Sequence, residues 1–184
     1  ETESEEYREM ARQCLDMTGE MVRAVDALME LANPASALTN VDQNEVIALH
    51  ELVDECARPF LPDAEARGVT LRATIDDSIV IERNAHYLRR IVKNLVENAT
   101  HYADENSEIV VTGERTPRGV LFAVENAASD APPETAERAF DTFWRADSSR
   151  FEVGRHAGLG LSLCQRIIQE IGGSIDVTFE AGRF

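Results

Sequence analysis

The sequence is short of apolar runs, of positive charge and of pairable cysteines, and each shortage excludes a class of protein. No apolar stretch approaches the roughly 20 residues of a membrane-spanning helix, and no signal peptide is visible. The 18 Lys and Arg residues stand against 34 Asp and Glu, and the formal net charge of −16 argues against nucleic acid or a membrane surface as the main partner. The three cysteines are predicted to be reduced, semi-buried thiols of a cytoplasmic protein rather than a disulfide or metal set: Cys14, Cys56 and Cys164.

A long helix is predicted near the start of the chain, over residues 5–32. Small and apolar residues recur there at alternating spacings of four and three, the heptad pattern of a helix that packs on another helix. This heptad seam consists of Tyr7, Ala11, Cys14, Thr18, Met21, Val25, Leu28 and Ala32. A lone helix cannot bury such a face, so we expect a partner outside this chain, a second copy, or both. The alternative is a helix folded back on the rest of the chain.

The remaining residues alternate short strands with helices, which predicts one α/β domain over 37–184 behind a helix and hinge over 1–36. At 184 residues and 43% hydrophobic content, the chain is long enough for one cored domain. Strands are expected over 45–48, 69–75, 78–82, 108–114, 120–125 and 174–179. Helices are expected over 49–67 with a break near Pro59 and Pro62, from an Asn84 cap to Tyr102, from Pro132 to Phe140, and over 159–171.

One predicted helix, residues 89–103, carries a row of polar side chains. Asn94 and Asn98 lie one turn apart, His101 continues the row, and Tyr102 lies beside it. Asn lowers helix stability because its amide competes with the backbone for hydrogen bonds. Two aligned Asn residues therefore indicate a binding ridge, and the alternative is a solvated helix face.

A basic stretch that ends in glycines supplies a matching signal for phosphate. Gly158-Leu159-Gly160-Leu161 stands where a polar loop turns into a helix, and the free amides of a helix N-terminus attract phosphate. A tight turn explains two such glycines equally well, and a solvated loop explains the polar residues. The cations that collect upstream in this acidic chain favour an anion site: Arg145, Arg150, Arg155 and His156.

Three motifs, in order, resemble the sequence boxes of sensor histidine kinases. They are Asn94-Leu-Val-Glu-Asn98-Ala-Thr-His-Tyr102, similar to the N box; Phe140-Asp-Thr-Phe143-Trp-Arg145, similar to the F box; and Gly158-Leu-Gly160-Leu161, similar to the G2 box. The resemblance covers about residues 44–184, and the heptad helix resembles the second helix of the kinase dimerisation domain. It implies a two-layer α+β sandwich of the Bergerat type, with a mixed sheet and helices on one face, as in gyrase, Hsp90 and MutL.

The resemblance also implies that the chain binds ATP and Mg²⁺. Asn98 would bind Mg²⁺ through its side-chain oxygen, and Asn94 would support the phosphate–metal site. Phe140 and Phe143 would anchor a lid, or else serve as core residues. Matching to the family further assigns nucleotide or phosphate contacts to His101, Tyr102, Asn126, Arg145, Arg150, Arg155, Gly158, Leu159, Gly160 and Leu161.

The implied activity is phosphoryl transfer rather than hydrolysis. ATP-hydrolysing relatives place a Glu at the position of Asn94 as general base, whereas an Asn cannot take a proton from water at neutral pH. The γ-phosphoryl group would pass to a histidine on a helix outside this chain and then to an Asp of a response regulator receiver domain. The one His-Glu-Leu sequence, at His50, lacks the Arg-Thr-Pro that follows the family's phosphoacceptor.

The resemblance implies a homodimer that forms through the heptad seam. The expected setting is the cytoplasm, including as the cytoplasmic part of a membrane-bound sensor. No membrane contact by this stretch and no nucleic acid partner are expected.

The adenine position departs from the family pattern. The family's Asp-x-Gly-x-Gly is matched here by Asn126-Ala-Ala-Ser-Asp130, so Asn126 has no charge, and Ala128 and Asp130 replace both glycines. Two other functions therefore stay open. One is a dimerisation or regulatory module that binds nucleotide poorly. The other is an anti-sigma-factor serine kinase of the same superfamily, against which the F box and the heptad helix argue.

Asn126→Asp restores the family's residue, and we expect it to preserve or raise the affinity for ATP, because a carboxylate also accepts the hydrogen bond of the adenine amino group. Isothermal titration calorimetry with ATP measures the change. A large loss of affinity in this variant would contradict the alignment of Asn126 with the adenine position.

Overall fold

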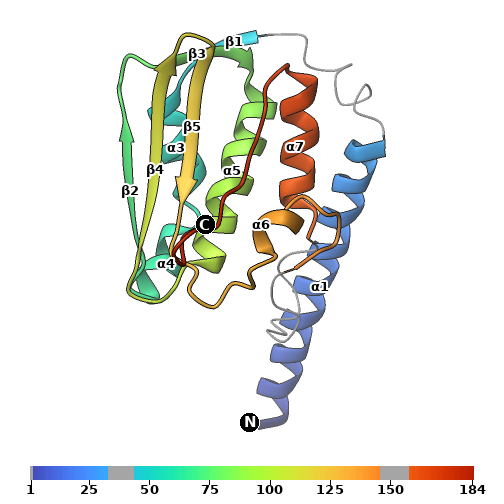
Figure 1. Cartoon of the computed structure of the whole chain (residues 1–184). Coiled ribbons are helices and arrows are strands. Elements are labelled where there is room, and N and C mark those ends of the chain that lie inside the picture. The colour runs from blue at the N-terminus through green and yellow to red at the C-terminus, as the bar shows by residue number, and fades with distance from the viewer. Residues whose placement is uncertain (1, 33–43, 146–157) are drawn as a thin grey trace.

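A computed structural model describes residues 2–32, 44–145 and 158–184 of the chain (Figure 1). Its helices are α1 (Thr2–Ala32), α3 (Leu49–Ala57), α4 (Leu61–Ala66), α5 (Ala85–Tyr102), α6 (Thr135–Arg138) and α7 (Gly160–Glu170). Its strands are β1 (Asn44–Ala48), β2 (Thr70–Ile75), β3 (Val80–Asn84), β4 (Glu108–Thr116) and β5 (Gly119–Glu125). Within the described ranges, no helix is both long and apolar enough to cross a membrane.

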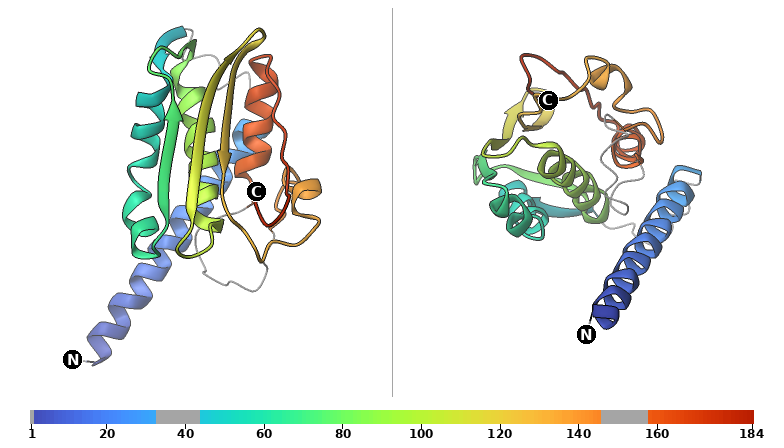
Figure 2. Two further views of the ribbon diagram at one scale, coloured as in Figure 1. Left: turned by 60° about the vertical axis from the view of Figure 1, so that its left-hand side comes forward. Right: turned by 90° about the horizontal axis from the view of Figure 1, so that it is seen from below.

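The domain has a sheet layer and a helix layer. Strands β2, β4 and β5 form a three-stranded sheet, in which β2 runs parallel to β4 and β5 runs antiparallel to it. Strands β1 and β3 form a separate antiparallel pair. Helices α3, α5 and α7 lie on one side of the sheet, and α5 packs between the other two (Figure 1, Figure 2). The predicted α/β architecture, with a mixed sheet and helices on one face, is confirmed.

The main core lies between the three-stranded sheet and helices α3 and α5. Ile109 and Val111 point from β4 toward the helices and are fully buried, as their two-residue spacing requires. Val53 of α3 and Val96 of α5 meet them and are also fully buried. Full burial of one such side chain stabilises the fold by about 1.5–3 kcal/mol. This packing fixes the position of α5 against the sheet.

Helix α1 confirms the predicted long helix but leaves its heptad seam open to solvent. Of the seam residues, Tyr7 is 67% exposed, Met21 64% and Val25 54%. Cys14 is exposed as well, so the prediction of a semi-buried thiol there is wrong. The helix touches the rest of the chain through another face, where Ala24 packs against an apolar cluster of α5 and α7. The seam therefore stays available to a partner.

The predicted strand over residues 174–179 is wrong. Its side chains alternate between half-buried and exposed, but the backbone has no ladder partner among the described residues. Pairing begins only further on, where Phe184 exchanges two backbone hydrogen bonds of 2.9 Å with Asn126, and Ala128 donates to Gly182 at 2.8 Å. The C-terminal segment thus joins the domain at the end of β5 rather than along it.

Two further elements are displaced from their predicted limits. The helix expected from Pro132 to Phe140 is shortened to α6, because the N–H and hydroxyl of Thr135 both turn back to the carbonyl of Pro132. Strand β3 begins two residues later than predicted, because Asp76 holds the preceding turn through a hydrogen bond from the N–H of Ser78. Both differences arise from local turns that end or delay an element.

Asn84→Ala is expected to lower the free energy of unfolding by about 1 kcal/mol, because the side chain of Asn84 accepts hydrogen bonds from the N–H groups of His86 and Tyr87 at the start of α5. Urea unfolding followed by circular dichroism measures the loss. Asn84→Asp keeps an acceptor at the cap and should retain most of the stability. Equal stability of the Ala and Asp variants would show that this cap contributes nothing.

Candidate functional site

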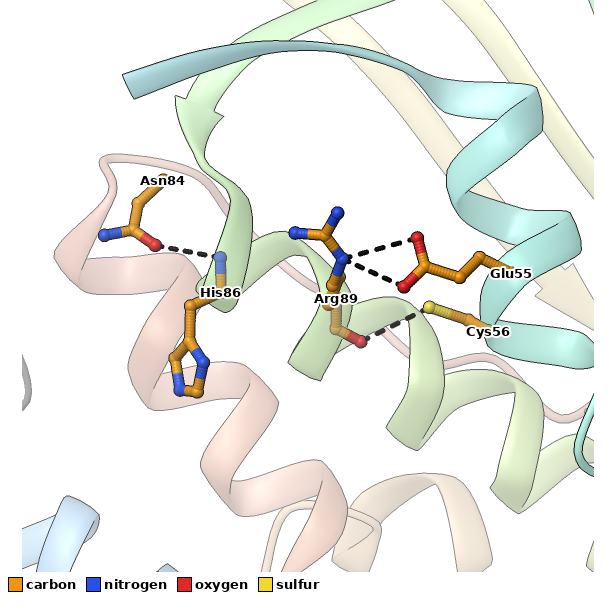
Figure 3. Close-up of polar contacts among 5 residues, drawn as sticks. All are labelled: Glu55, Cys56, Asn84, His86 and Arg89. Atoms are coloured by element: carbon orange, nitrogen blue, oxygen red, sulfur yellow. Dashed lines mark hydrogen bonds and ion pairs between the residues drawn. The ribbon is translucent and has the colours of Figure 1, made fainter. Parts of the chain in front are cut away.

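Helix α5 carries the predicted polar ridge, and its first turns are fixed by side chains from α3 (Figure 3). Arg89 pairs with Glu55, with its Nε 3.1 and 3.4 Å from the two carboxylate oxygens. Beside this pair, the Cys56 thiol donates to the carbonyl of Arg89 at 3.7 Å. Asn84 caps the helix through the N–H of His86, as Figure 3 shows. The N-terminal half of α5 is thereby anchored on the side opposite to α7.

The C-terminal end of α5 is held by one guanidinium group. Arg67, which follows α4, donates to the carbonyls of Thr100 and Ala103, with the second bond at 3.3 Å. These carbonyls belong to the last turn and have no partner inside the helix. A cation at this end also interacts favourably with the helix dipole. Both ends of α5 are therefore fixed, and so is the ridge between them.

Helix α7 packs antiparallel to α5 and brings its N-terminus to the ridge. Cys164 lies against the carbonyl of Ile91, whereas Gly160, one turn earlier on α7, lies against Asn94. Residue numbers therefore increase along α7 in the direction in which they decrease along α5, so the two helices are antiparallel. The open N-terminal end of α7, at Gly160, therefore points along α5 toward its next turn, about 6 Å further on, where Asn98 lies. The resemblance assigned both the ridge and Gly160 to one nucleotide site, and the structure brings Asn94 and Gly160 side by side.

The N-terminal amides of α7 have no side-chain cap among the described residues. The capping position is Leu159, which has no acceptor group in its side chain. The hydroxyl of Ser162 does not cap these amides either, because it donates to the carbonyl of Leu159 at 3.0 Å. Uncapped amides at a helix start attract anions. The α7 N-terminus is therefore suited to hold a phosphate group.

Gly160 marks a close approach of the two helices. A Cβ atom at Gly160 would lie 3.2 Å from Oδ1 of Asn94, which is tighter than ordinary contact. The Asn94 amide nitrogen donates to the carbonyl of Arg90 at 2.9 Å. The side chain of Asn94 thus lies against the first residue of α7, where the uncapped N–H groups of that helix begin.

A buried thiol completes the surroundings of Asn94. Burial raises the pKa of Cys164 to about 12, while the charge of Arg90 and a hydrogen bond with Asn94 act in the opposite direction. Sequence analysis did not select Cys164, although its four-residue spacing from Gly160 places both on one face of α7.

The outer part of the ridge offers polar groups toward the same space. Asn98 is half-buried, and no hydrogen bond joins its side chain to another described residue. His101 and Tyr102 are half-buried too, and their rings meet edge to face with centroids 4.7 Å apart. The predicted row of Asn94, Asn98 and His101 therefore lies on one side of α5, and within the described ranges the side chain of Asn98 makes no hydrogen bond.

The predicted adenine residue lies at the end of β5. Asn126 is 2% exposed, and its amide nitrogen donates to the carbonyl of Ala127 at 3.2 Å. Asp104, just after α5, accepts hydrogen bonds through its carboxylate from the N–H and the hydroxyl of Ser129. The backbone N–H of Asp104 donates to the carbonyl of Ala127. Residues 126–129 are therefore attached to the C-terminal end of α5 and form a wall beside the ridge.

The start of α7 is joined to the end of the predicted F box. The N–H of Phe143 donates to the carbonyl of Gly158 at 2.9 Å, and both residues have positive φ angles, 67° and 68°. A Cβ atom at Gly158 would lie 2.7 Å from the carbonyl oxygen of Trp144, so only glycine fits. Phe143 is 59% exposed, so the alternative of a core residue is wrong for it, whereas Phe140 is half-buried.

The predicted cations of the loop are only partly described. Arg145 is exposed at the end of the F box. Arg150, Arg155 and His156 lie outside the described residues. His50, at the start of α3, lies with its Nδ1 3.9 Å from a carboxylate oxygen of Asp77.

Comparison with known proteins places this arrangement in a family. The model of the histidine kinase-, DNA gyrase B- and HSP90-like ATPase family matches residues 83–183, more than half of the chain. The chain belongs to this family. The match begins at the cap of α5 and ends in the segment that pairs with Asn126, so it contains the ridge, the residue 126–129 wall and α7.

Curated relatives of the chain are sensor proteins. The chain is 34% identical to the probable sensor protein PcoS of Escherichia coli over 92% of its own length and 36% of that protein. It is 27% identical to the sensor protein SrrB of Staphylococcus aureus over 99% of its length and 31% of that protein. The chain thus spans about a third of the length of these relatives. The resemblance to the ATP-binding domain of sensor histidine kinases is confirmed.

Solved structures of histidine kinases share the fold. The catalytic domain of ThkA superposes with a TM-score of 0.65 at 24% identity, over 77% of this chain and 90% of that one. Full-length ShkA, solved in complex with AMPPNP, gives a TM-score of 0.73 at 22% identity, over 89% of this chain and 34% of that one. The second match extends over more of this chain than the first.

The two buried thiols are expected to resist modification in the folded chain, because burial raises the pKa of both Cys56 and Cys164 and leaves little thiolate. In a Cys14→Ser variant, which removes the exposed thiol, we expect a chromogenic disulfide reagent at pH 8 to react at least ~100-fold more slowly than it does in urea. Stoichiometric labelling of the folded variant within minutes would contradict the burial of these thiols.

Proposed function

We propose that this chain is the ATP-binding catalytic part of a two-component sensor histidine kinase. In the whole protein, the γ-phosphoryl group of ATP would be transferred to a histidine on a helix outside this chain, and then to an Asp of a response regulator. One observation carries the proposal: the uncapped N-terminus of α7 faces the Asn94–Asn98 ridge of α5, with Gly160 permitting the close approach. Family membership and the sensor-protein relatives support it.

The residues present fit ATP with Mg²⁺. The α7 amides, with Gly158 and Gly160 beside them, suit the phosphate groups, because no Cβ atom obstructs the backbone there. The half-buried amide of Asn98 supplies the oxygen ligand that Mg²⁺ prefers. When bound, Mg²⁺ neutralises charge on the phosphates and so favours their attack by a nucleophile. His101 and the exposed Arg145 would add positive charge around the phosphates.

The nucleotide's base would lie against the wall of residues 126–129. The side-chain nitrogen of Asn126 donates to the carbonyl of Ala127. The side-chain oxygen of Asn126 would therefore be the acceptor for the adenine amino group. Tyr102, at the end of α5, would pack near the nucleotide. Leu159 and Leu161 would contact it where α7 begins.

The ridge favours transfer over hydrolysis. A general base for water would have to stand near the phosphates, and the amide of Asn94 is not basic. Glu97 points about 100° around the helix from Asn98, away from the ridge. The chain would therefore hold and orient the phosphates, while the acceptor comes from elsewhere, which is the division of roles typical of phosphoryl transfer by positioning.

The heptad seam of α1 is the proposed dimerisation surface. Its apolar side chains are exposed in the single chain, and a second copy of the helix pair would bury them. The proposed final acceptor is a response regulator receiver domain; the solved complex of ThkA with its response regulator TrrA has a related fold. A cytoplasmic setting follows from this partner.

A non-enzymatic regulatory module is the second candidate, and the residue 126–130 segment favours it. Ala128 and Asp130 stand where the family has glycines, and Ala128 is buried and paired with Gly182. A pocket narrowed at this point would bind the base weakly.

Calorimetry with ATP distinguishes the two candidates. We expect the chain to bind ATP in the presence of Mg²⁺, and Asn98→Ala to weaken that binding at least ~10-fold, because the oxygen ligand of the metal is lost. The exposed Asn44→Ala, on β1, is the matched control and should bind as the unmodified chain does. Absence of binding by the unmodified chain would favour the regulatory module.

Phosphorylation assays test the assignment of the acceptor. Incubated with radiolabelled ATP, the chain of 184 residues should incorporate no acid-labile phosphate. A longer protein that includes the acceptor helix should become labelled, and should lose the label when its response regulator is added. Labelling of His50 or another histidine of this chain would contradict the assignment.

A further inference from the structure

The outer edge of β5 carries backbone groups that no strand of the described ranges covers, because β5 ends the sheet and pairs only with β4. Just past β5, Asn126 exchanges two backbone hydrogen bonds with Phe184. The N–H and C=O of Asn126 therefore point away from β4. In an antiparallel ladder this direction alternates along the chain, so the same groups of Val124, Phe122 and Val120 also point to the outer edge.

Residues 174–179 are a second stretch that lacks a ladder partner among the described residues. Their side chains nevertheless alternate as in a strand with one covered face. Ile175, Val177 and Phe179 are half-buried, and Asp176 and Thr178 between them are exposed. This stretch therefore has the side-chain pattern of a strand without the backbone pairing of one.

A tight turn sends the chain back along residues 174–179. Glu180 and Arg183 exchange backbone hydrogen bonds of 3.0 and 2.9 Å across the turn. The two residues between them, Ala181 and Gly182, have positive φ angles of 51° and 75°. Positive φ at both central positions is the type I′ geometry that favours a β-hairpin. The chain beyond Gly182 is therefore directed as the second strand of a hairpin.

Arg183 is paired on both sides, which fixes the width of the space beyond it. It lies opposite Glu180 on one side and opposite Ala127 on the other, antiparallel in both cases. Neighbouring strands lie about 4.8 Å apart, so the two flanking backbones are about 10 Å apart at this level. That is the separation of two strands with a third between them. Arg183 and Phe184 thus occupy the first positions of a central strand.

The register with β5 shows which side chains of such a strand would face the core. Val124 precedes Ala127 by three residues, so it lies opposite the third residue after Arg183, which is the second after Phe184. By the same count, Phe122 lies opposite the fourth residue after Phe184. The side chains of Val124 and Phe122 are half-buried against the main core. Side chains at the second and fourth positions would therefore point to the core as well.

The register with residues 174–179 gives the same result independently. Val177 precedes Glu180 by three residues and Ile175 precedes it by five, so they lie opposite the same second and fourth positions. Both side chains are half-buried. The two flanking stretches thus offer apolar side chains to the same positions of the strand between them.

We infer that the space between β5 and residues 174–179 is a binding site for one antiparallel strand, and that its occupant is the polypeptide that continues from Phe184. Phe184 supports this occupant, because its backbone already makes two hydrogen bonds with Asn126 in the direction of the added strand (Figure 1). The strand would satisfy the open edge of β5 and give residues 174–179 the partner that their alternation lacks. It would also hold residues 126–129 more firmly, since its first residues are bonded to them.

Amide hydrogen exchange of the 184-residue chain tests whether the edge is open. The N–H groups of Val120, Phe122 and Val124 should exchange at least ~10-fold faster than those of Leu121 and Ala123, which point to β4. Equal protection of the two sets would overturn the inference. Protection of the edge set that rises with protein concentration would identify a second copy as the occupant and would also overturn it.

A six-residue extension after Phe184 tests the occupant and its register. Thr-Val-Thr-Val-Thr-Val places valine at the second, fourth and sixth positions, on the core side. We expect it to raise Tm by at least ~4 °C and to slow exchange of the Phe122 and Val124 N–H groups at least ~10-fold.

The matched control is the extension Val-Thr-Val-Thr-Val-Thr, which has the same composition but turns its valines to solvent. It should produce neither change. Equal effects of the two extensions, or no effect of the first, would overturn the inference. Both measurements are made without nucleotide, so their outcome is independent of the proposed function.

Discussion

The antiparallel contact between α5 and α7 is the constraint on which the rest of the site depends. Because Gly160 lies against Asn94, the first turn of α7 cannot shift along α5 without a clash or a gap. The two cations at the ends of α5, Arg89 and Arg67, fix one partner of this contact. The backbone bond between Phe143 and Gly158 fixes the approach to the other. The proposed phosphate site would follow from this packing of two helices.

The residues at the contact between α5 and α7 make different contributions to it. Gly160 permits the close approach, Asn94 provides polar groups that remain neutral at all accessible pH values, and the buried thiol of Cys164 packs between the two helices. A carboxylate in place of Asn94 would bring a charge close to the phosphates and a base close to water. The neutral ridge is compatible with holding a triphosphate without consuming it.

Much of the fold could be predicted from the sequence, because local patterns determine it. The Asn84 cap and the break at Pro59 each act within a few residues, and each lies where the sequence indicated. The ridge itself could be found from spacing on a single helix. The meeting of Gly160 with Asn94 and of Cys164 with Ile91 could not, because it depends on how two helices, joined by a contact that spans 73 residues, are brought into register. The strand predicted over 174–179 fails for the same reason: alternation of side chains shows a buried face but not a backbone partner.

Sequence separation has a further consequence for how the domain acquires its site. The bond from Cys164 to Ile91 spans 73 residues, and the ion pair of Arg183 with Glu125 spans 58. The β4–β5 hairpin, by contrast, closes over only a few residues. Closing long loops is entropically costly and slow, so local elements form before distant ones meet. The contact between α5 and α7 is one of these distant ones, so it forms only when α7 docks on the rest of the domain. Partly folded copies of the chain therefore lack the proposed nucleotide site, which needs both helices in contact.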